Sequence, residues 1–360
     1  MQPILATAPA LAGLAARLAA QPRIGLDTEF LRERTYRAQL CLVQIAAADE
    51  AVCIDALAPG SLAPLAQVLA ADSVIKVMHA SRQDLEVLWA AAGVTRPVFD
   101  TQVAASLTGL PAQIGYAEAV RRLLGKELAK SHTRTDWSRR PLSPEQIEYA
   151  LDDVRYLLPL AMQLQEQLQR LGRLGWLAEE LAALADTRSL TIAPDDAWQR
   201  VKALRELDPA RERLARALAA WRERRAIEHN RPRGWILQDV VLREIVLQVP
   251  RTTAQLKHIP AMPPGLAKRH GAELLECVRS AAVPDPPPPL AARPRPDPAQ
   301  AALLKKLGTI SHSVARELQL VPEVLATRRD LEQLAAGRRD GPLLRGWRRE
   351  VLGERLLGAL

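Results

Sequence analysis

The sequence predicts an α/β domain followed by helical domains, and three observations support this fold class. Between residues 23 and 103, short runs rich in Val, Ile and Leu alternate with stretches of helical spacing. After about residue 185 the hydrophobic spacing is helical throughout. The stretch VPDPPPPLAARPRPDP at 283–298 predicts a stiff linker, because its prolines exclude helix and sheet. We therefore expect an α/β domain at 1–185, a helical domain at 195–282 and a smaller helical domain at 299–360.

The individual elements follow in chain order. The runs RIGLD, QLCLVQIA, AVCIDA, SVIKVMHA and PVFDTQVA predict strands, and SLAPLAQVLA and SRQDLEVLWAAAG have helical spacing. SPEQIEYALDDVRYLLPLAMQL begins with Ser143, and Gln146 follows three residues later, as in a capping box. In the second half, a long helical pattern breaks at NRPRGW, which predicts two helices within a packet of five.

Composition and charge narrow the class of protein. The first twenty residues predict an amphipathic helix rather than a signal peptide, because no Lys or Arg precedes the apolar run and Arg17 interrupts it. No apolar run reaches the length of a membrane span, and three cysteines without a CxxC pair form no disulfide framework. We therefore expect a cytoplasmic protein without membrane association, and no obligate protein partner is evident.

Positive charge is concentrated in the second half of the chain. The net charge of +8 divides into −2 for residues 1–185, with 18 basic and 20 acidic residues, and +10 for residues 186–360, with 31 and 21. Such a basic region favours a polyanionic partner, because neutralising phosphates releases counterions. The alternative is a solvated basic surface on ordinary helices.

Two acidic residues end the first predicted strand. Asp27 and Glu29 are two residues apart on an extended chain, so their side chains point to the same face and repel each other. Asp84 lies in the first turns of a predicted helix, and Tyr149 and Asp153 lie one helical turn apart. If the four carboxylates meet at one sheet edge, hard divalent cations such as Mg²⁺ or Mn²⁺ would relieve the repulsion. Two such ions can activate a water and stabilise the leaving oxygen of a phosphodiester.

The motifs around these residues resemble a known family. LDTEF, HASRQDLEVL and YALDDVRYL resemble the three exonuclease motifs of the DEDD superfamily, and Tyr149 four residues before Asp153 marks its tyrosine-bearing branch. DTEFLRERTYRAQLCLVQIA, VFDTQVAA and KSHTRTDWSRRPLS resemble the ribonuclease D family, and the region from DDAWQRVKAL to VVLREI resembles the HRDC domain that follows its nuclease domain. The chain departs from the motif of this family at Ala38, where we associate the family with a proline. The difference affects only the local turn and not the predicted chemistry.

The resemblance implies a ribonuclease-H-like α/β nuclease domain, with a mixed sheet flanked by helices, followed by all-α HRDC-type domains. It implies a 3′→5′ exoribonuclease that uses two divalent metal ions, Mg²⁺ or Mn²⁺, and releases nucleoside 5′-monophosphates from RNA with a free 3′ end, such as tRNA precursors. Asp27 and Glu29 would be metal ligands, with Asp27 bridging both ions. Asp153 would complete the first metal site, and Asp84 would hold the second ion largely through water. Tyr149 would orient the attacking water, because a neutral phenol is a weak base near pH 7.

The sequence also offers candidate contacts to RNA, several of which have a structural alternative. They are Thr28, Phe30, His79, Lys130 and Arg134. Phe30 could stack on a terminal base or belong to the core, and His79 could face the substrate or have a purely structural role. The loop LAKSHTRTDWSRRPL could position phosphates or be pinned by Trp137. Trp221 and Trp235, beside many arginines, could stack on RNA or anchor a helical core.

Two other functions stay open at this point. A DNA 3′→5′ exonuclease would use the same carboxylates, but the chain has no separate region of polymerase size. A catalytically inactive RNA-binding protein is disfavoured, because all five catalytic positions are filled.

Overall fold

The structure is a computed structural model, and its residues form two compact units. It describes residues 4–48, 50–60, 62–128, 135–184, 186, 190, 193–201, 204, 207–286 and 298–360. Unit 1 comprises Met1–Leu31, Gln39–Leu190 and Pro296–Leu360, and unit 2 comprises Arg32–Ala38 and Thr191–Arg295. Within the described residues, the structure has no helix with the length and hydrophobicity needed to span a bilayer.

Unit 1 contains a five-stranded mixed sheet of order β3-β2-β1-β4-β5. The strands are β1 (Arg23–Leu31), β2 (Gln39–Ala46), β3 (Ala51–Asp55), β4 (Ile75–Met78) and β5 (Val98–Asp100). β1, β2 and β3 pair antiparallel in succession, whereas β1, β4 and β5 run parallel. The register of β1 against β2 shifts between Glu29 and Phe30. Such a bulge changes the direction of neighbouring side chains, and here it lies beside the acidic pair.

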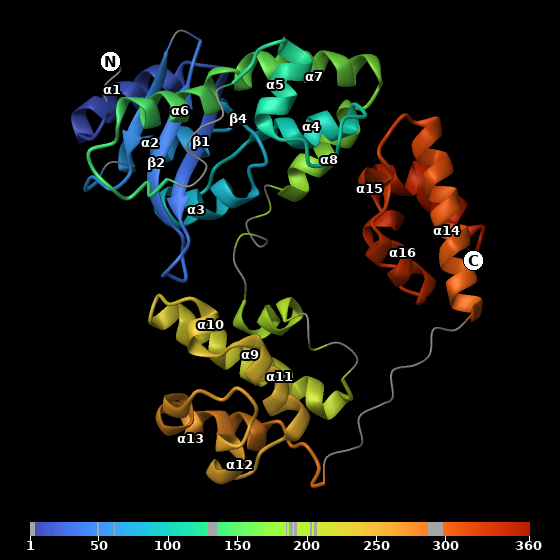
Figure 1. Cartoon of the computed structure of the whole chain (residues 1–360). Helices are drawn as coiled ribbons and strands as arrows, with labels where there is room; N and C mark the ends of the chain where they lie inside the picture. Colours follow the sequence, from blue (N-terminus) through green and yellow to red (C-terminus); the bar gives the residue numbers. More distant parts are fainter. Residues whose placement is uncertain are drawn as a thin grey trace. The chain divides into compact units, whose positions relative to one another are not determined.

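Helices cover both sides of this sheet. They are α1 (Ala8–Ala19), α2 (Ala63–Ala70), α3 (Arg82–Ala92), α4 (Thr101–Leu107), α5 (Tyr116–Leu124), α6 (Pro144–Arg155), α7 (Leu157–Arg170) and α8 (Leu174–Leu184). Figure 1 shows α6 lying across the strands, and α6 contacts β1, β2 and β3. Gly25 of β1 allows this approach, because a Cβ there would lie 3.2 Å from the carbonyl oxygen of Val154. The predicted mixed sheet flanked by helices is therefore confirmed.

The C-terminal helices belong to unit 1. They are α14 (Pro298–Glu317), α15 (Pro322–Leu325), α16 (Arg328–Ala335), η3 (Pro342–Leu344), α17 (Gly346–Arg348), the π-helical η4 (Arg349–Gly353) and α18 (Glu354–Leu357). Buried Arg173 donates to the carbonyl oxygens of Leu107 (2.7 Å) and Leu318 (2.5 Å). Trp176 and Trp347 stack with ring centroids 4.5 Å apart.

One hydrophobic core runs from the sheet through α7 and α8 into these C-terminal helices. Gly109, at φ +98°, lies so close to this region that a Cβ there would be 2.5 Å from the carbonyl oxygen of Gln319. We expected residues 299–360 to form a domain of their own, but α7 and α8 present apolar side chains that these residues bury. Whether residues 299–360 are HRDC-like stays a prediction.

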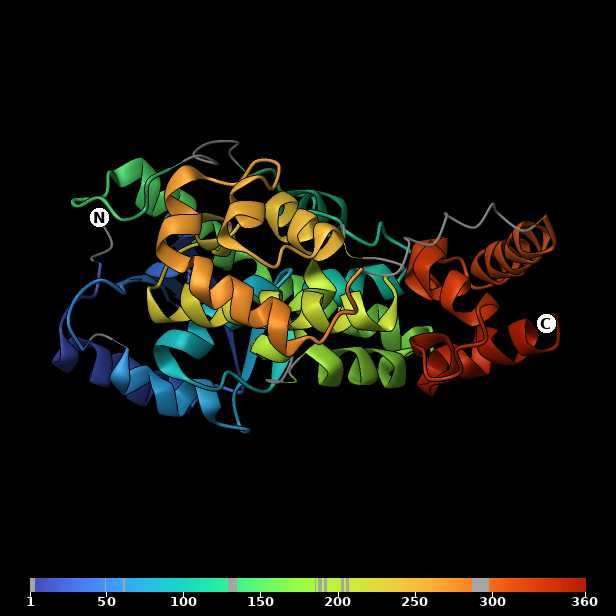
Figure 2. The same cartoon turned by 90° about the horizontal axis from the view of Figure 1, so that it is seen from below.

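Unit 2 is a packet of helices around its own core. Its elements are the 3₁₀ helix η2 (Pro194–Arg200), α9 (Pro209–Glu228), α10 (Arg233–Ile236), α11 (Asp239–Gln248), α12 (Thr253–Lys257) and α13 (Pro264–Ser280). Figure 1 and Figure 2 both show α9 to α13 gathered together. The predicted break at NRPRGW lies between α9 and α11, and the short α10 begins within it.

A short segment from the β1–β2 connection completes unit 2. The Tyr36 hydroxyl donates to Glu223 Oε1 at 2.6 Å, and Asn230 Oδ1 accepts from the backbone N–H groups of Tyr36 and Arg37 at 3.2 Å each. Residues 32–38 are thus held by α9 and by the turn that follows it, although they directly follow the strand that carries Asp27 and Glu29.

Candidate active site

The structure brings the four predicted carboxylates together at the end of β1. Asp27 and Glu29 come from β1, Asp153 from α6 and Asp84 from α3. Burial, followed by the charges of Asp84, Asp153 and Glu29, raises the pKa of Asp27 well above its usual range. Like charges shift each other in this way only when they are close and poorly hydrated. The four side chains therefore form a single acidic cluster.

The pKa values of the other three carboxyls are also raised, chiefly by burial. Burial, with the charges of Asp153 and Asp84, raises the pKa of Glu29 to about 8. Burial, with the charge of Asp152, raises the pKa of Asp153 to about 7. Burial also raises the pKa of Asp84 to about 6. A metal-free cluster would therefore hold protons near neutral pH, whereas a bound cation would favour the ionised carboxylates.

The N-terminus of α6 positions the helical half of the cluster. Ser143 Oγ accepts from the Gln146 N–H at 3.3 Å, and Gln146 Oε1 accepts from the Ser143 N–H at 2.7 Å. The predicted capping box is thus confirmed. It fixes where the helix begins, and so it sets the face that carries Tyr149 and Asp153.

Tyr149 is linked directly to the cluster. Its hydroxyl donates a hydrogen bond to the Asp153 carboxylate, and its ring lies 6.2 Å from that of buried Trp137 at 28°. Burial, with the charges of Asp153, Glu29 and Asp27, raises the pKa of the Tyr149 phenol. The phenol is therefore neutral at physiological pH, as a group that orients water rather than deprotonates it would be.

The position of Asp84 is set by a hydrogen bond to its side chain and by the turn that precedes α3. Thr28 Oγ1 donates to Asp84 Oδ1 at 2.5 Å. The turn that leads into α3 is fixed by Asp100, which accepts from the Ser81 N–H at 2.7 Å and the Ser81 hydroxyl at 2.8 Å. Sequence reasoning did not single out Asp100. The sequence signal for Asp100 is VFDTQ, in which an Asp stands at the N-cap position of a helix. In the structure Asp100 is the N-cap of α4, and its side chain also accepts from the Gln102 N–H at 2.8 Å.

Gln44 is a second residue that sequence reasoning missed. It lies opposite Asp27 on β2, and directly opposed residues place their side chains on the same face of a sheet. Its side chain is 0% exposed, and among the described residues neither amide atom has a hydrogen-bond partner. An unpaired buried amide costs about 1–3 kcal/mol. Gln44 thus places a donor and an acceptor beside the acidic cluster.

The candidate RNA contacts differ in their surroundings. Thr28 is buried and directed to Asp84, and Phe30 is partly buried at the bulge. Both ring nitrogens of His79 have protein partners, the Thr101 hydroxyl at 2.8 Å and the Ile114 carbonyl at 2.9 Å. This favours the structural alternative for His79. Lys130 and Arg134 lie outside the described residues.

The part of the preceding loop that is described, residues 135–142, is pinned to unit 1. Trp137 is buried, and Arg140 pairs with Asp55 (Nη2 to Oδ1, 2.5 Å) and donates to the Cys41 carbonyl at 2.8 Å. Arg139 remains exposed beside Asp136, at 3.1 Å.

The two tryptophans of unit 2 have different environments. Trp221 is buried, and its indole N–H donates to Glu273 at 2.6 Å, so it anchors the core. Trp235 is 58% exposed, and the Arg231 guanidinium lies 5.7 Å from its ring centre.

The donor set suits a hard divalent cation. Carboxylate oxygens are the ligands that Mg²⁺ and Mn²⁺ prefer, and the unpaired Gln44 amide can hydrogen-bond an ionised ligand. Across the described ranges, no three His, Cys, Asp or Glu side chains are already drawn into an ion-binding group. The charges of neighbouring carboxylates raise the pKa values of Asp27 and Glu29, so these groups repel one another when no cation is bound.

Comparisons with known proteins agree with this geometry. A 3'-5' exonuclease family model matches residues 3–169, and an HRDC domain model matches residues 211–278. Ribonuclease D of Gluconacetobacter diazotrophicus is 41% identical over 98% of this chain and 91% of that protein. Ribonuclease D of Nitrobacter hamburgensis is 39% identical over 98% of this chain and 94% of that protein. The chain belongs to the ribonuclease D family.

Solved structures extend this assignment to the fold. The crystal structure of Escherichia coli RNase D, described as an exoribonuclease involved in structured RNA processing, is similar with a TM-score of 0.89 and 31% identity, covering 100% of this chain and 98% of that one. The catalytic core of RRP6 from Trypanosoma brucei shares the fold, with a TM-score of 0.58, 23% identity, and coverage of 78% and 80%. The ribonuclease D family assignment makes this chain a 3′→5′ exoribonuclease with an HRDC domain, as the motifs predicted.

Proposed function

We propose that this exoribonuclease uses two divalent metal ions, Mg²⁺ or Mn²⁺, and releases nucleoside 5′-monophosphates one at a time. The observation that carries the proposal is the acidic cluster, in which the pKa values of all four carboxyls are raised, those of Asp27 and Glu29 partly by the charges of the other members. Such a cluster is unfavourable without cations, and its ligands suit these ions. When bound, the ions lower the pKa of a water and neutralise the developing charge of the phosphodiester.

Each residue of the cluster has a role in this proposal. Asp27 and Glu29 would hold metal, with Asp27 shared by both ions, Asp153 completing the first site and Asp84 serving the second. Thr28 keeps Asp84 in place through its hydroxyl. Tyr149, which donates to Asp153, orients the attacking water.

Gln44 supports the cluster from β2. Its amide N–H can donate to the ionised carboxylate of Asp27, opposite which it lies. That bond would satisfy an amide which otherwise lacks a partner among the described residues, and it would hold Asp27 in one orientation.

Unit 2 and the loop before α6 are the proposed RNA-binding regions. Exposed Trp235, flanked by Arg231, offers a surface on which a base can stack. Phe30, Lys130 and Arg134 stay candidate contacts near the 3′ end. The proposed substrates are tRNA precursors and other stable RNAs with 3′ extensions. The proposed compartment is the cytoplasm, because the three cysteines are free thiols.

The test uses single-stranded RNA labelled at either end, with Mg²⁺ or Mn²⁺ and then with EDTA. We expect the 5′-labelled RNA to shorten by one nucleotide at a time and the 3′ label to appear early as a mononucleotide. DNA of the same sequence is the control substrate. Asp27→Asn, Asp84→Asn and Asp153→Asn should each abolish hydrolysis while circular dichroism shows a folded chain. Near-normal hydrolysis by Asp27→Asn would refute the metal-based proposal.

A further inference from the structure

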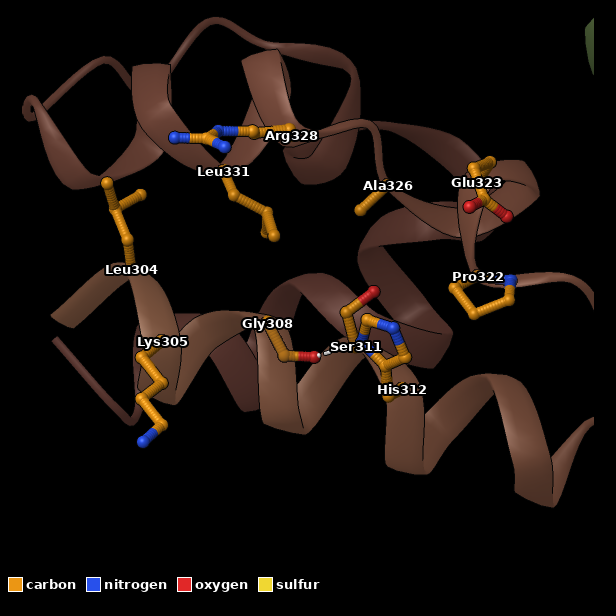
Figure 3. A pocket seen from close by; sticks show the side chains of 10 residues that line it. All are labelled: Leu304, Lys305, Gly308, Ser311, His312, Pro322, Glu323, Ala326, Arg328 and Leu331. Atoms are coloured by element: carbon orange, nitrogen blue, oxygen red, sulfur yellow. Dashed lines mark hydrogen bonds between the residues drawn. The ribbon is translucent and has the colours of Figure 1, made fainter. Parts of the chain in front are cut away.

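A cavity of about 430 Å³ lies among the C-terminal helices of unit 1, apart from the residues of the acidic cluster. Its volume is within the range of small-molecule sites. It is enclosed by α14 on one side and by α15, α16 and the turn between them on the other (Figure 3). The lining residues are Leu304, Lys305, Gly308, Ser311, His312, Pro322, Glu323, Ala326, Arg328 and Leu331.

Gly308, in the middle of α14, leaves one wall of this space open. A Cβ at this position would have no heavy atom within 4 Å, apart from its own helix and chain neighbours. Glycine inside a helix costs about 1 kcal/mol relative to alanine. The backbone of Gly308 does not have a positive φ, so the turn geometry of α14 does not require glycine. The missing side chain therefore opens a slot, whose walls include the apolar side chains of Leu304, Ala326 and Leu331.

A polar group points into this slot. Ser311 is 3% exposed as a residue, and its hydroxyl donates no hydrogen bond to a residue that the structure describes. A helical hydroxyl ordinarily bonds to the carbonyl four residues earlier, as Thr309 does to Lys305 at 3.0 Å. In Figure 3 the Ser311 hydroxyl is instead directed into the cavity. Its hydroxyl is not among the described buried polar atoms that lack a partner, so it is open to the cavity and can hydrogen-bond a polar ligand there.

Charges of opposite sign mark the two ends of the cavity. Lys305 and Arg328 lie toward one end and Glu323 toward the other (Figure 3). Arg328 donates from Nε to Glu332 at 2.8 Å, and its side chain is 89% exposed, so its terminal nitrogens can reach an anion at the cavity mouth. The Lys305 ammonium is turned outward in Figure 3, and its flexible stem can bring it to the mouth. His312 is fixed by the bond from Nδ1 to the Gly308 carbonyl at 2.7 Å.

We propose that this cavity binds one nucleotide whose base carries an exocyclic amino group. The phosphate would meet Arg328 and Lys305, the planar base would fill the apolar slot beside Ser311, and the amino group would donate to Glu323. Adenine, cytosine and guanine have such a group and uracil does not. The nucleotide is either the 5′-monophosphate product or an unstacked residue of an RNA chain, and the inference rests on RNA being the substrate.

The test measures binding to the full chain by calorimetry in EDTA, so that the metal-dependent site neither binds nor cleaves. AMP, CMP, GMP and UMP are titrated, followed by short oligomers of A and of U. Gly308→Leu fills the slot, Ser311→Ala removes the hydroxyl, and Thr309→Ala on the same helix is the matched control. We expect Gly308→Leu to weaken binding at least about tenfold, with a melting temperature equal to or above that of the unaltered chain.

The outcomes separate the two sources of nucleotide. Binding of AMP, CMP and GMP that is lost in Gly308→Leu identifies the free product, whereas binding of the A oligomer alone that is lost in the same variant identifies an RNA chain. Gly308→Leu binding as well as the Thr309→Ala control, or no binding of either ligand to the unaltered chain, would overturn the proposal. Equal affinity for UMP and CMP would overturn the role of Glu323. Hydrolysis of short RNA should be unchanged in Gly308→Leu, so a failure here is distinct from a failure of the metal-based mechanism.

Discussion

Replacing Glu29 by glutamine should stabilise the metal-free protein, with an effect that grows with pH. The folded state raises the pKa of Glu29 from its ordinary 4.5 to about 8, through burial and the charges of Asp153 and Asp84. A carboxyl with a raised pKa contributes stability that is complete below its ordinary pKa and is lost as the pH rises through the folded value. The unaltered chain should therefore lose stability between about pH 4.5 and pH 8 when metal is chelated. Glutamine keeps the shape of Glu29 and carries no charge.

The size of the effect follows from that difference in pKa. A rise from 4.5 to about 8 corresponds to at most roughly 5 kcal/mol, at about 1.4 kcal/mol for each pH unit. Water entering the metal-free cluster screens the charges, so we expect about 2 kcal/mol to be measured. For a unit of this size, about 2 kcal/mol corresponds to a melting temperature higher by roughly 4–8 °C.

The assay is thermal unfolding in EDTA at about pH 5 and about pH 8.5, on either side of the titration. Near-ultraviolet dichroism, to which the stacked Trp176–Trp347 pair of unit 1 contributes, follows the transition. We expect little difference between Glu29→Gln and the unaltered chain at the lower pH and the full gain at the higher one. Addition of Mn²⁺ should stabilise the unaltered chain more than the variant. A variant that is equally destabilised at both pH values would show that Glu29 is held by contacts independent of its charge, and the reasoning would fail.

Four further predictions address other residues. Tyr149→Phe should lower turnover about 10²-fold in single-turnover assays and leave RNA affinity unchanged. If RNA affinity falls and turnover is intact, Tyr149 is a binding residue instead. Gln44→Leu should weaken Mn²⁺ binding about tenfold in calorimetry without lowering the melting temperature; unchanged Mn²⁺ affinity would remove its role beside Asp27. Gly109→Ala should cost about 2–3 kcal/mol in unfolding experiments, because of its φ of +98° and the nearby Gln319 carbonyl, and a neutral result would contradict the close approach. Trp235→Ala should weaken binding of long single-stranded RNA by about 1–3 kcal/mol in fluorescence titrations and leave hydrolysis of short RNA intact; equal affinity would leave Trp235 without an RNA role.

Local patterns in the sequence predicted the parts of the site that depend on neighbouring residues. The alternation of an extended chain placed Asp27 and Glu29 on one face, and helical spacing did the same for Tyr149 and Asp153. The capping box at Ser143 was also visible, because its two residues are three positions apart. That Asp84 joins them came from the resemblance, since no local rule brings α3 to the end of β1.

Features set by pairing between distant segments could not be predicted in this way. Gln44 occurs within a continuous apolar run, and only the register of β2 against β1 places it opposite Asp27. Thr28 was a candidate RNA contact, but the position of α3 directs its hydroxyl to Asp84. The packing of residues 298–360 was equally hidden, because the spacing of an amphipathic helix shows that a face is buried without showing what covers it.

The shared core of unit 1 has a consequence for how the protein is made on the ribosome. Every carboxylate of the cluster, together with α7 and α8, is synthesised before the helices of unit 2, yet the helices that cover Trp176 and Leu177 are synthesised after them. At about 5–20 residues per second, the nascent nuclease waits several seconds or longer with this apolar surface uncovered. A chain that stops after unit 2 would carry all the catalytic residues on an incomplete core, and it would be exposed to chaperones and proteases. The nuclease core of unit 1 is therefore complete only after the helices α14 to α18 have been synthesised.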